Sequence, residues 1–494
     1  MKILIAYPPL ASEKGVPLLA QNRQFQWFKD PTYIYPMVPA SAATMLKAAG
    51  FDVFWEDGIA EGLSDAAWRR RFDEIRPDVV VLESKTPVIK RHWDIVRSIK
   101  ASDPSTIVVL IGDHVTARPE ESMNACPVDY VITGGDYDFS LVEICRDLAG
   151  KASPASYPPG VWYRIEGRIE NTGPFAVNHD LALLPRIDRE LTKWQLYAYK
   201  NGNYKYTPGT YVMAGRDCWW GRCRFCSWTT LYPAGTYRTV PVEKHLDEIG
   251  YLIENYGIRE IFDDSGCFPK GEWRRAFCRG MIDRGYAGRV TLGCNMRVGG
   301  LNEDDCRLMK RAGFRFILIG LESVCQSTLD RLDKGVRVED IAVMCRMAKR
   351  AGLEPHVTIM VGYPWETQKE AEETIAFARD LFRKGFIDTL QATIVVPYPG
   401  TPLYDEAEKE GWLSITDWDD FDMKKSVWRS PVSPEDLQGF VRSLYGSALS
   451  PRFLIRKLTS VRNLDDVIYL LKAGRKLLGH LRDFARRPHA GANP

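Results

Sequence analysis

The sequence lacks a hydrophobic run long enough to cross a bilayer. Hydrophobic residues make up 45% of its 494 positions, yet no run of about eighteen apolar residues occurs. The first apolar stretch ends in Pro8 and Pro9 without a small-residue cleavage site after it, which argues against a secretory signal. A formal net charge of only +2 gives no reason to expect nucleic acid or an acidic surface as partner. We therefore expect a cytoplasmic enzyme of two or three domains with no spanning helix.

Histidine is also scarce, and the scarcity matters where cysteines gather. The chain has seven histidines, and none lies between His179 and His245. Within that gap, Cys218, Cys223 and Cys226 fall close together. Because the chain holds 11 cysteines in 494 residues, chance is a poor explanation for this spacing. The segment predicts a site built from thiolates.

Three thiolates without a fourth ligand suit an iron–sulfur cluster with one iron left open for a substrate or cofactor. A structural zinc ion would need a fourth ligand from elsewhere in the chain, such as Cys267 or Cys294. A disulfide is a third interpretation, which the intracellular character of the chain disfavours. Aromatic residues in and beside the motif would keep water off a cluster. These are Trp219, Trp220, Phe225 and Trp228.

The segment 216–230 resembles the cluster motif of the radical S-adenosylmethionine (SAM) enzymes. In that family three cysteines hold a [4Fe-4S] cluster, SAM chelates the fourth iron, and reductive cleavage gives a 5'-deoxyadenosyl radical. The resemblance implies that Cys218, Cys223 and Cys226 are the cluster ligands. It also implies a flavodoxin or ferredoxin as external electron donor. One departure is the spacing, because four residues separate the first two cysteines where the family usually has three.

Residues 1–150 alternate short apolar runs with helix-like stretches, as in a doubly wound parallel sheet. Ligands of such sheets bind beyond the carboxyl ends of the strands. No Gly-x-Gly-x-x-Gly follows the first strand, which disfavours a nucleotide-binding domain. The expected strands are 3–6, 52–55, 79–82, 107–111 and 130–132, and the expected helices are 40–49, 90–101 and 140–148.

This arrangement resembles the Rossmann-like cobalamin-binding domain of the class B, methyltransferase-like radical SAM enzymes. The stretch 112–121 is the most telling part, although the Asp-x-His-x-x-Gly pattern of free-standing cobalamin domains is absent. That absence points to cobalamin bound without a protein histidine. The alternatives are a degenerate domain that binds nothing and, for the histidine of this stretch, a loop residue hydrogen-bonded to backbone. The resemblance places these residues near cobalamin: Glu83, Thr86, Gly112, His114, Thr116 and Gly134.

Residues 151–207 are punctuated by proline and glycine and predict a connector, with a hairpin over 161–170 that turns at Glu166–Gly167. From 208 to 425 strands and helices alternate again, which predicts a partial or complete parallel barrel with its site at the carboxyl ends of the strands. The expected strands lie near 211–214, 260–262, 289–294, 316–319, 356–360 and 392–395.

Polar or glycine residues follow these barrel strands in order. Taken alone, Asp263 and Asp264 could cap a helix. Arg297 and Glu322 could each form an ordinary salt bridge. Loops in this order after a cysteine motif resemble the radical SAM barrels, and the resemblance places all of them near SAM. Glu366 is expected to cap the next helix. The SAM candidates are Asp263, Asp264, Arg297, Glu322 and Gly362.

Residues 426–494 predict helices over 434–448 and 465–484 with Leu and Ile on one face. One interpretation is a basic amphipathic lid that meets an anionic or lipid-like substrate or touches a membrane surface. The other, favoured interpretation is a helical cap on the barrel with a solvated basic face. The basic residues are Arg452, Arg456, Lys457, Arg462, Lys472, Arg475, Lys476, Arg482, Arg486 and Arg487.

The resemblance as a whole implies a cobalamin-dependent radical SAM enzyme, first of all a methyltransferase. In the implied reaction one SAM methylates reduced cobalamin, and the radical from a second SAM abstracts hydrogen from an unactivated carbon. That carbon then takes the methyl group from methylcobalamin. A cyclase or ring-rearranging enzyme that uses cobalamin without net methylation is the alternative, and a non-catalytic cobalamin or redox-sensing protein is the alternative of another class. The substrate could be a small molecule, a peptide or a lipid, and no motif identifies it.

Overall fold

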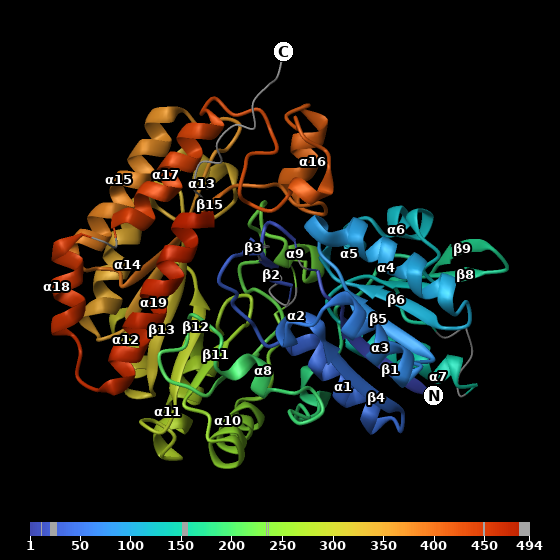
Figure 1. The fold of residues 1–494 in the computed structure, drawn as a ribbon. Coiled ribbons are helices and arrows are strands. Elements are labelled where there is room, and N and C mark those ends of the chain that lie inside the picture. The colour runs from blue at the N-terminus through green and yellow to red at the C-terminus, as the bar shows by residue number, and fades with distance from the viewer. Residues whose placement is uncertain are drawn as a thin grey trace.

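The computed structural model describes residues 1–10, 12–19, 27–150, 157–233, 235, 237–447 and 450–483. Residues 484–494, with Arg486 and Arg487 of the predicted basic face, lie outside the described residues. Two mainly parallel sheets lie side by side, the first in blue to cyan and the second in green to orange (Figure 1). Helices cover both sheets, and the last two helices flank the second sheet on its outer side.

The first sheet has the strand order β4-β1-β5-β6-β7-β8-β9. Its first five strands are parallel, and their order reverses between β1 and β5, where doubly wound sheets form a ligand crevice. The last two form a hairpin that pairs antiparallel with β7. The strands are β1 (Lys2–Tyr7), β4 (Asp52–Asp57), β5 (Val79–Glu83), β6 (Ile107–Ile111), β7 (Tyr130–Ile132), β8 (Val161–Ile165) and β9 (Arg168–Asn171).

Central strands of this sheet form because they are apolar throughout. Val79 to Leu82 and Val108 to Leu110 are completely buried, as expected for parallel strands covered on both faces. The helices around them are α1 (Met37–Ala48), α2 (Gly58–Glu61), α3 (Asp65–Ile75), α4 (Ile89–Ser102), α5 (Asp113–Ala117), α6 (Pro119–Ala125) and α7 (Tyr137–Leu148), with a short 3₁₀ turn, η1 (Thr86–Val88).

The second sheet is a six-stranded parallel array whose strands follow chain order, as in a partial (β/α) barrel. Its strands are β10 (Gly209–Val212), β11 (Glu260–Asp263), β12 (Thr291–Met296), β13 (Phe314–Glu322), β14 (Glu354–Val361) and β15 (Thr389–Ile394). Its helices are α10 (Val242–Tyr256), α11 (Gly271–Asp283), α12 (Glu303–Arg311), α13 (Gln326–Arg331), α14 (Val338–Arg350), α15 (Gln368–Lys384) and α16 (Pro402–Lys409).

The remaining elements connect or cover the two sheets. Between them lies the short helix α9, beside α5 of the first sheet (Figure 1). The connecting and covering elements are β2 (Val16–Pro17), β3 (Trp27–Phe28), η3 (Leu181–Leu183), α8 (Gln195–Ala198), α9 (Trp228–Leu231), η4 (Trp418–Asp420), α17 (Pro434–Ser447), α18 (Pro451–Thr459) and α19 (Leu464–Asp483). In the part of the chain that the structure describes, no helix combines the length and apolarity needed to cross a membrane. The predicted fold class, a Rossmann-like domain followed by a partial barrel and C-terminal helices, is confirmed.

Candidate active site

The three cysteines of the motif lie on the loop that follows β10, at the carboxyl end of the barrel. None of the three is in a disulfide and all three are half-buried, and a turn in which the Cys226 N–H donates to the Cys223 carbonyl holds the loop. Gly266, in the loop after β11, packs so closely that a Cβ there would lie 2.9 Å from the Cys218 Cβ. Burial raises the pKa of the Cys223 thiol to about 12, so this sulfur would ionise only with a metal bound.

Cations surround the same loop. Lys334 is buried, and its Nζ lies 2.7 Å from Glu322 Oε1. Burial alone would lower the pKa of the Lys334 ammonium, but the charge of Glu322 outweighs it and raises that pKa. No group of three or more His, Cys, Asp or Glu side chains among the described residues is arranged to hold a single metal ion.

Glu322 reaches Lys334 through an unusual backbone conformation. Its φ is +63°, a region that non-glycine residues seldom adopt and that clusters at functional sites. The register between β13 and β14 shifts beside it. Gly320 leaves room for the ion pair, because a Cβ there would come within 2.1 Å of Glu322 Oε1. The predicted SAM residue is therefore held by a lysine that sequence reasoning missed.

Arg297 lies against the aromatic residues of the cysteine loop. Its guanidinium is 3.9 Å from the centroid of Trp220 and 5.3 Å from that of Trp219. It donates to the carbonyls of Lys334 and Gly335, and burial lowers its pKa. The two tryptophans thus hold the arginine beside the cysteines.

Asp263 is the last residue of β11 and Asp264 follows it directly, but the two acids have different surroundings. Asp263 Oδ2 accepts from the Ala214 N–H at 2.9 Å, its Oδ1 accepts from Ser265, and His245 lies 3.3 Å away. Asp264 is equally buried and accepts from Asn295 Nδ2 at 3.4 Å. Asp263 therefore shapes the loop through internal bonds.

Gly362 and Glu366 interact with each other after β14. The Gly362 N–H donates to Glu366 Oε2 at 2.6 Å, and the Gly362 carbonyl accepts from Trp428 at 2.7 Å. The prediction that Glu366 caps the next helix is wrong. Thr367 caps α15 in a capping box with Glu370, while the Glu366 side chain turns inward and is fully buried.

This buried carboxyl group predicts a pH effect. Burial raises the pKa of Glu366 to about 7, so the folded protein keeps it protonated at pH values where the unfolded chain has ionised. Stability should therefore fall as the pH rises from about 5 to about 8. We expect Glu366→Gln to remove up to about 3 kcal/mol of this dependence, as measured by urea unfolding across that range. An unchanged pH slope in the variant would contradict the assignment.

At the carboxyl edge of the first sheet, buried acids pair with phenols. The Tyr7 hydroxyl donates to Glu83 Oε2 at 2.5 Å, at the β1–β5 switch point, and Tyr197 donates to Asp57 Oδ2 at 2.6 Å. Burial raises the pKa of Glu83 to about 7 and that of Asp57 to about 6. The Tyr137 hydroxyl is buried there without a hydrogen-bond partner. Of these residues only Glu83 was predicted as a site residue.

His114 and Thr86 bond to one another. His114 Nδ1 lies 3.1 Å from Thr86 Oγ1, and Nε2 lies 3.3 Å from Glu121 Oε2. The ring is completely buried, with its centroid 5.3 Å from that of Trp418. The His114 ring therefore contacts side chains, whereas the alternative interpretation expected a hydrogen bond to backbone.

The other three predicted cobalamin residues also contact their neighbours closely. Thr116 Oγ1 donates to the Gly112 carbonyl and accepts from the Gly134 N–H. Gly112 has a φ of +117°, and a Cβ there would lie 2.2 Å from the Ser84 carbonyl oxygen. The three residues form one tight layer of backbone at the strand ends.

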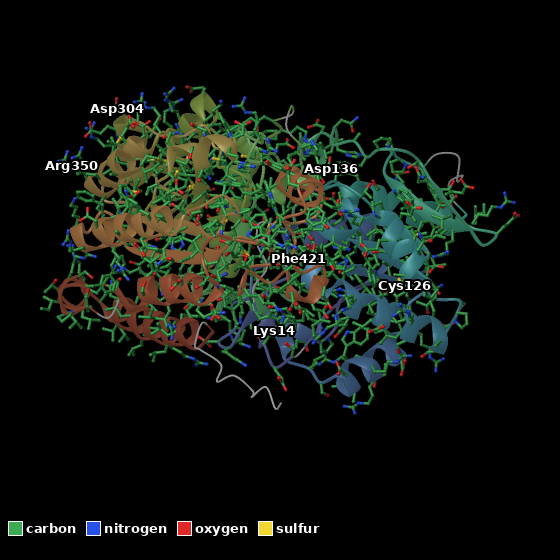
Figure 2. The ribbon with its side chains drawn as sticks, turned by 90° about the horizontal axis from the view of Figure 1, so that it is seen from above. Lys14, Cys126, Asp136, Asp304, Arg350 and Phe421 are labelled. Atoms are coloured by element: carbon green, nitrogen blue, oxygen red, sulfur yellow. The ribbon has the colours of Figure 1, made fainter. Side chains whose placement is uncertain are left out.

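A buried ion network joins the two halves of the site. Arg216, two residues before Cys218, donates to Asp138 at 2.8 and 2.5 Å and to Asp136 at 3.1 Å. Arg238 also lies 2.5 Å from Asp136. Asp136 lies where the cyan domain meets the barrel half (Figure 2). The cysteine loop and the carboxyl edge of the first sheet are therefore fixed to one another.

The three cysteines follow the first strand of a partial barrel, as the resemblance to the radical SAM enzymes implied. Residues 213–378 match the model of the Radical SAM superfamily. This part of the chain is a Radical SAM domain, and the predicted enzyme class is confirmed.

Relatives extend the likeness beyond that domain. An uncharacterized methyltransferase of Pyrococcus horikoshii is 27% identical over 425 residues, which are 85% of this chain and 89% of the relative. An anaerobic magnesium-protoporphyrin IX monomethyl ester cyclase of Cereibacter sphaeroides is 26% identical over 372 residues, 73% of this chain and 58% of the relative. The structure of OxsB, a cobalamin-dependent SAM radical enzyme with aqua-cobalamin and SAM bound, has a TM-score of 0.69 and 14% identity and covers 97% of this chain and 71% of that one. The chain therefore shares its overall fold with that structure.

Proposed function

We propose that the protein is a cobalamin-dependent radical SAM methyltransferase that acts on an unactivated carbon. The observation that carries the proposal is the cysteine loop fixed by Arg216 to the carboxyl edge of a doubly wound domain. The methyltransferase relative, which is matched over most of its length, supports the same activity. Together a [4Fe-4S] cluster, SAM and cobalamin would supply a hydrogen-abstracting radical and a methyl group.

The residues present fit a cluster. The donor set is three cysteine thiols on one loop, which is the ligand type that iron–sulfur clusters use. Gly266 provides a cradle against Cys218 that a larger residue would fill. Lys334 and Arg297 would offset the negative charge of the thiolates. Cys218, Cys223 and Cys226 would hold the cluster.

Some of the predicted SAM residues would contact SAM, and others would hold the loops that do. We propose Asp264, Arg297 and Glu322 as the polar residues nearest SAM. Asp263 supports the loop through its internal bonds. Gly362 would offer only van der Waals contact, since its N–H and C=O are already engaged.

On the cobalamin side, Glu83, Gly112, Thr116 and Gly134 would line the carboxyl edge of the first sheet. Tyr137 has a buried hydroxyl without a partner, and such a donor fits a ligand rich in amide oxygens. His114 is enclosed by protein, so we propose that it supports the loop through Thr86.

The cyclase relative gives a second candidate function, cobalamin-dependent ring formation without net methylation. The two differ in what becomes of SAM. Protein reconstituted anaerobically with iron, sulfide and hydroxocobalamin would be incubated with SAM and a chemical reductant. A methyltransferase should release S-adenosylhomocysteine, the product left when SAM gives up its methyl group, as well as 5'-deoxyadenosine. Release of 5'-deoxyadenosine alone would favour the cyclase, and release of neither would contradict both.

The electron donor is part of the proposal. Beside the cluster loop, Arg222 stacks on Trp220 at 4.1 Å and Lys270 on Trp219 at 4.7 Å, and both cations are exposed. Arg224 and Arg331 nearby share one carboxylate, that of Glu406. This cationic surface suits an acidic redox protein such as a flavodoxin or ferredoxin.

Reversing two of these charges should impair the protein donor alone. We expect Arg222→Glu with Lys270→Glu to raise the KM for a reduced flavodoxin by about tenfold at low salt, and to leave the rate of 5'-deoxyadenosine formation with dithionite unchanged. The matched control is Arg346→Glu with Arg379→Glu, which changes the same charge on exposed parts of α14 and α15. Equal losses with dithionite would show damage to the site, and no loss with flavodoxin would place the donor elsewhere.

A further inference from the structure

The last two described helices expose an apolar stripe. Eight of the fourteen exposed large hydrophobic residues among the described positions lie on α18 and α19 or at their ends. Their exposed fractions run from 40% to 72%. The eight, named here the apolar stripe, are Leu454, Ile455, Leu458, Leu464, Val467, Ile468, Leu471 and Leu478.

The stripe is a second apolar face, because another face of each helix already packs on the barrel. Phe453 of α18 stacks on Phe382 with a centroid distance of 4.4 Å. On α19, Leu477 and Leu481 pack against the core, and His480 stacks on Tyr445. The stripe residues of α19 are spaced at i, i+3, i+4, i+7 and i+14, so they share one side of the helix. Packing within the chain therefore does not explain them.

Basic residues flank the stripe. Arg462 lies two residues before α19 and is exposed, and Lys472 of α19 is half-exposed. Arg475 lies one turn after Leu471 and is 78% exposed even though it contacts Asp30. The acids at the start of α19, Asp465 and Asp466, are already paired with Arg259 and Lys205. The charge left around the stripe is positive.

We propose that α18 and α19 dock the protein on an anionic lipid surface. An amphipathic helix with a wide apolar side and flanking Lys and Arg lies in the bilayer interface, with its apolar side among the acyl chains and its cations at the headgroups. The helix α18 lies at the edge of the barrel half (Figure 1), and the stripe residues of both helices are exposed.

Two other occupants fit less well. A second copy of the chain would bring the same basic residues to the interface, where like charges repel. Residues 484–494 contain one large apolar side chain, Phe484, and two arginines, too few to cover eight apolar residues. Anionic headgroups would neutralise Arg462 and Lys472. The inference is independent of the proposed function.

Vesicle sedimentation of the full chain tests the proposal. Vesicles of equal parts phosphatidylglycerol and phosphatidylcholine should bind the wild type at low salt, and pure phosphatidylcholine should bind it more weakly. Ile455→Ser with Leu458→Ser and Leu471→Ser should lower the partition coefficient at least about tenfold, because membrane affinity grows with the apolar groups buried. Arg462→Glu with Lys472→Glu should lower binding to the anionic vesicles alone.

The matched control is Ile165→Ser with Leu183→Ser and Val343→Ser, which removes apolar residues exposed by 49% to 73% outside the stripe. This control should bind like the wild type. Equal binding by the stripe variant, or no binding by the wild type, would overturn the proposal. Sedimentation velocity could also overturn it. If the wild type were a dimer and the stripe variant a monomer, the occupant of the stripe would be a second copy of the chain.

Discussion

Replacement of Cys218 by alanine is expected to abolish the activity of the site. A [4Fe-4S] cluster with three protein ligands cannot be held stably by two. Reconstituted protein should therefore fall from about four irons per chain to a small fraction, and 5'-deoxyadenosine formation should fall by at least about a thousandfold. Iron and sulfide analysis, the visible spectrum and product quantification would measure the two effects.

A second cysteine variant separates loss of the cluster from the general effect of removing a thiol. Cys278 is buried in α11, and burial raises its pKa to about 12. Its replacement by alanine removes a small apolar group from the core and should leave the iron content unchanged. If Cys278→Ala lost as much iron as Cys218→Ala, or if Cys218→Ala kept its cluster, the three-cysteine assignment would be wrong.

The positions of the strands along the chain and the cysteine loop could be predicted because both are local patterns. Each buried parallel strand is a short apolar run, and the residues that follow it lie at a known edge of the sheet. Asp264, Arg297 and Glu322 could therefore be placed at strand ends in advance. Their roles toward SAM stay predictions.

The partners of these residues could not be predicted. Lys334 reaches Glu322 from beyond α13, and Tyr7 reaches Glu83 from another strand. No spacing in the sequence encodes such pairs, because they depend on how separate loops meet in space. His114 likewise lies beside Trp418, which comes after the last barrel strand in the sequence.

The sequence did contain the signal that places Glu366 outside the helix. Thr367 followed by Glu370 is the pattern of a capping box, and it moves the helix start one residue beyond Glu366. The exposure of the apolar stripe had no such signal. The sequence shows that α19 is amphipathic, but it does not show which side of the helix meets the barrel.

Loss of Arg216 should destabilise the whole protein and, separately, the cluster. Arg216 is buried between Asp136 and Asp138, and its removal leaves the buried carboxylate of Asp138 without this ion pair. Breaking a buried pair on one side costs about 3–5 kcal/mol, so Arg216→Met should lose about that much apparent stability. Burial would raise the pKa of Asp136, but His179, Arg216 and Arg238 hold it well below its usual range. This contribution is therefore complete at neutral pH and lost only in acid.

Arg315→Met is the control that separates stability from position. Arg315 is equally buried and pairs with Glu260 and Glu354 at 2.5 and 2.6 Å, far along the chain from the cysteine loop. Both variants should unfold at lower urea concentration, but only Arg216→Met should take up less iron on reconstitution, because Arg216 anchors the loop two residues before Cys218. Equal iron uptake by the two variants would mean that the network stabilises the fold without positioning the cluster.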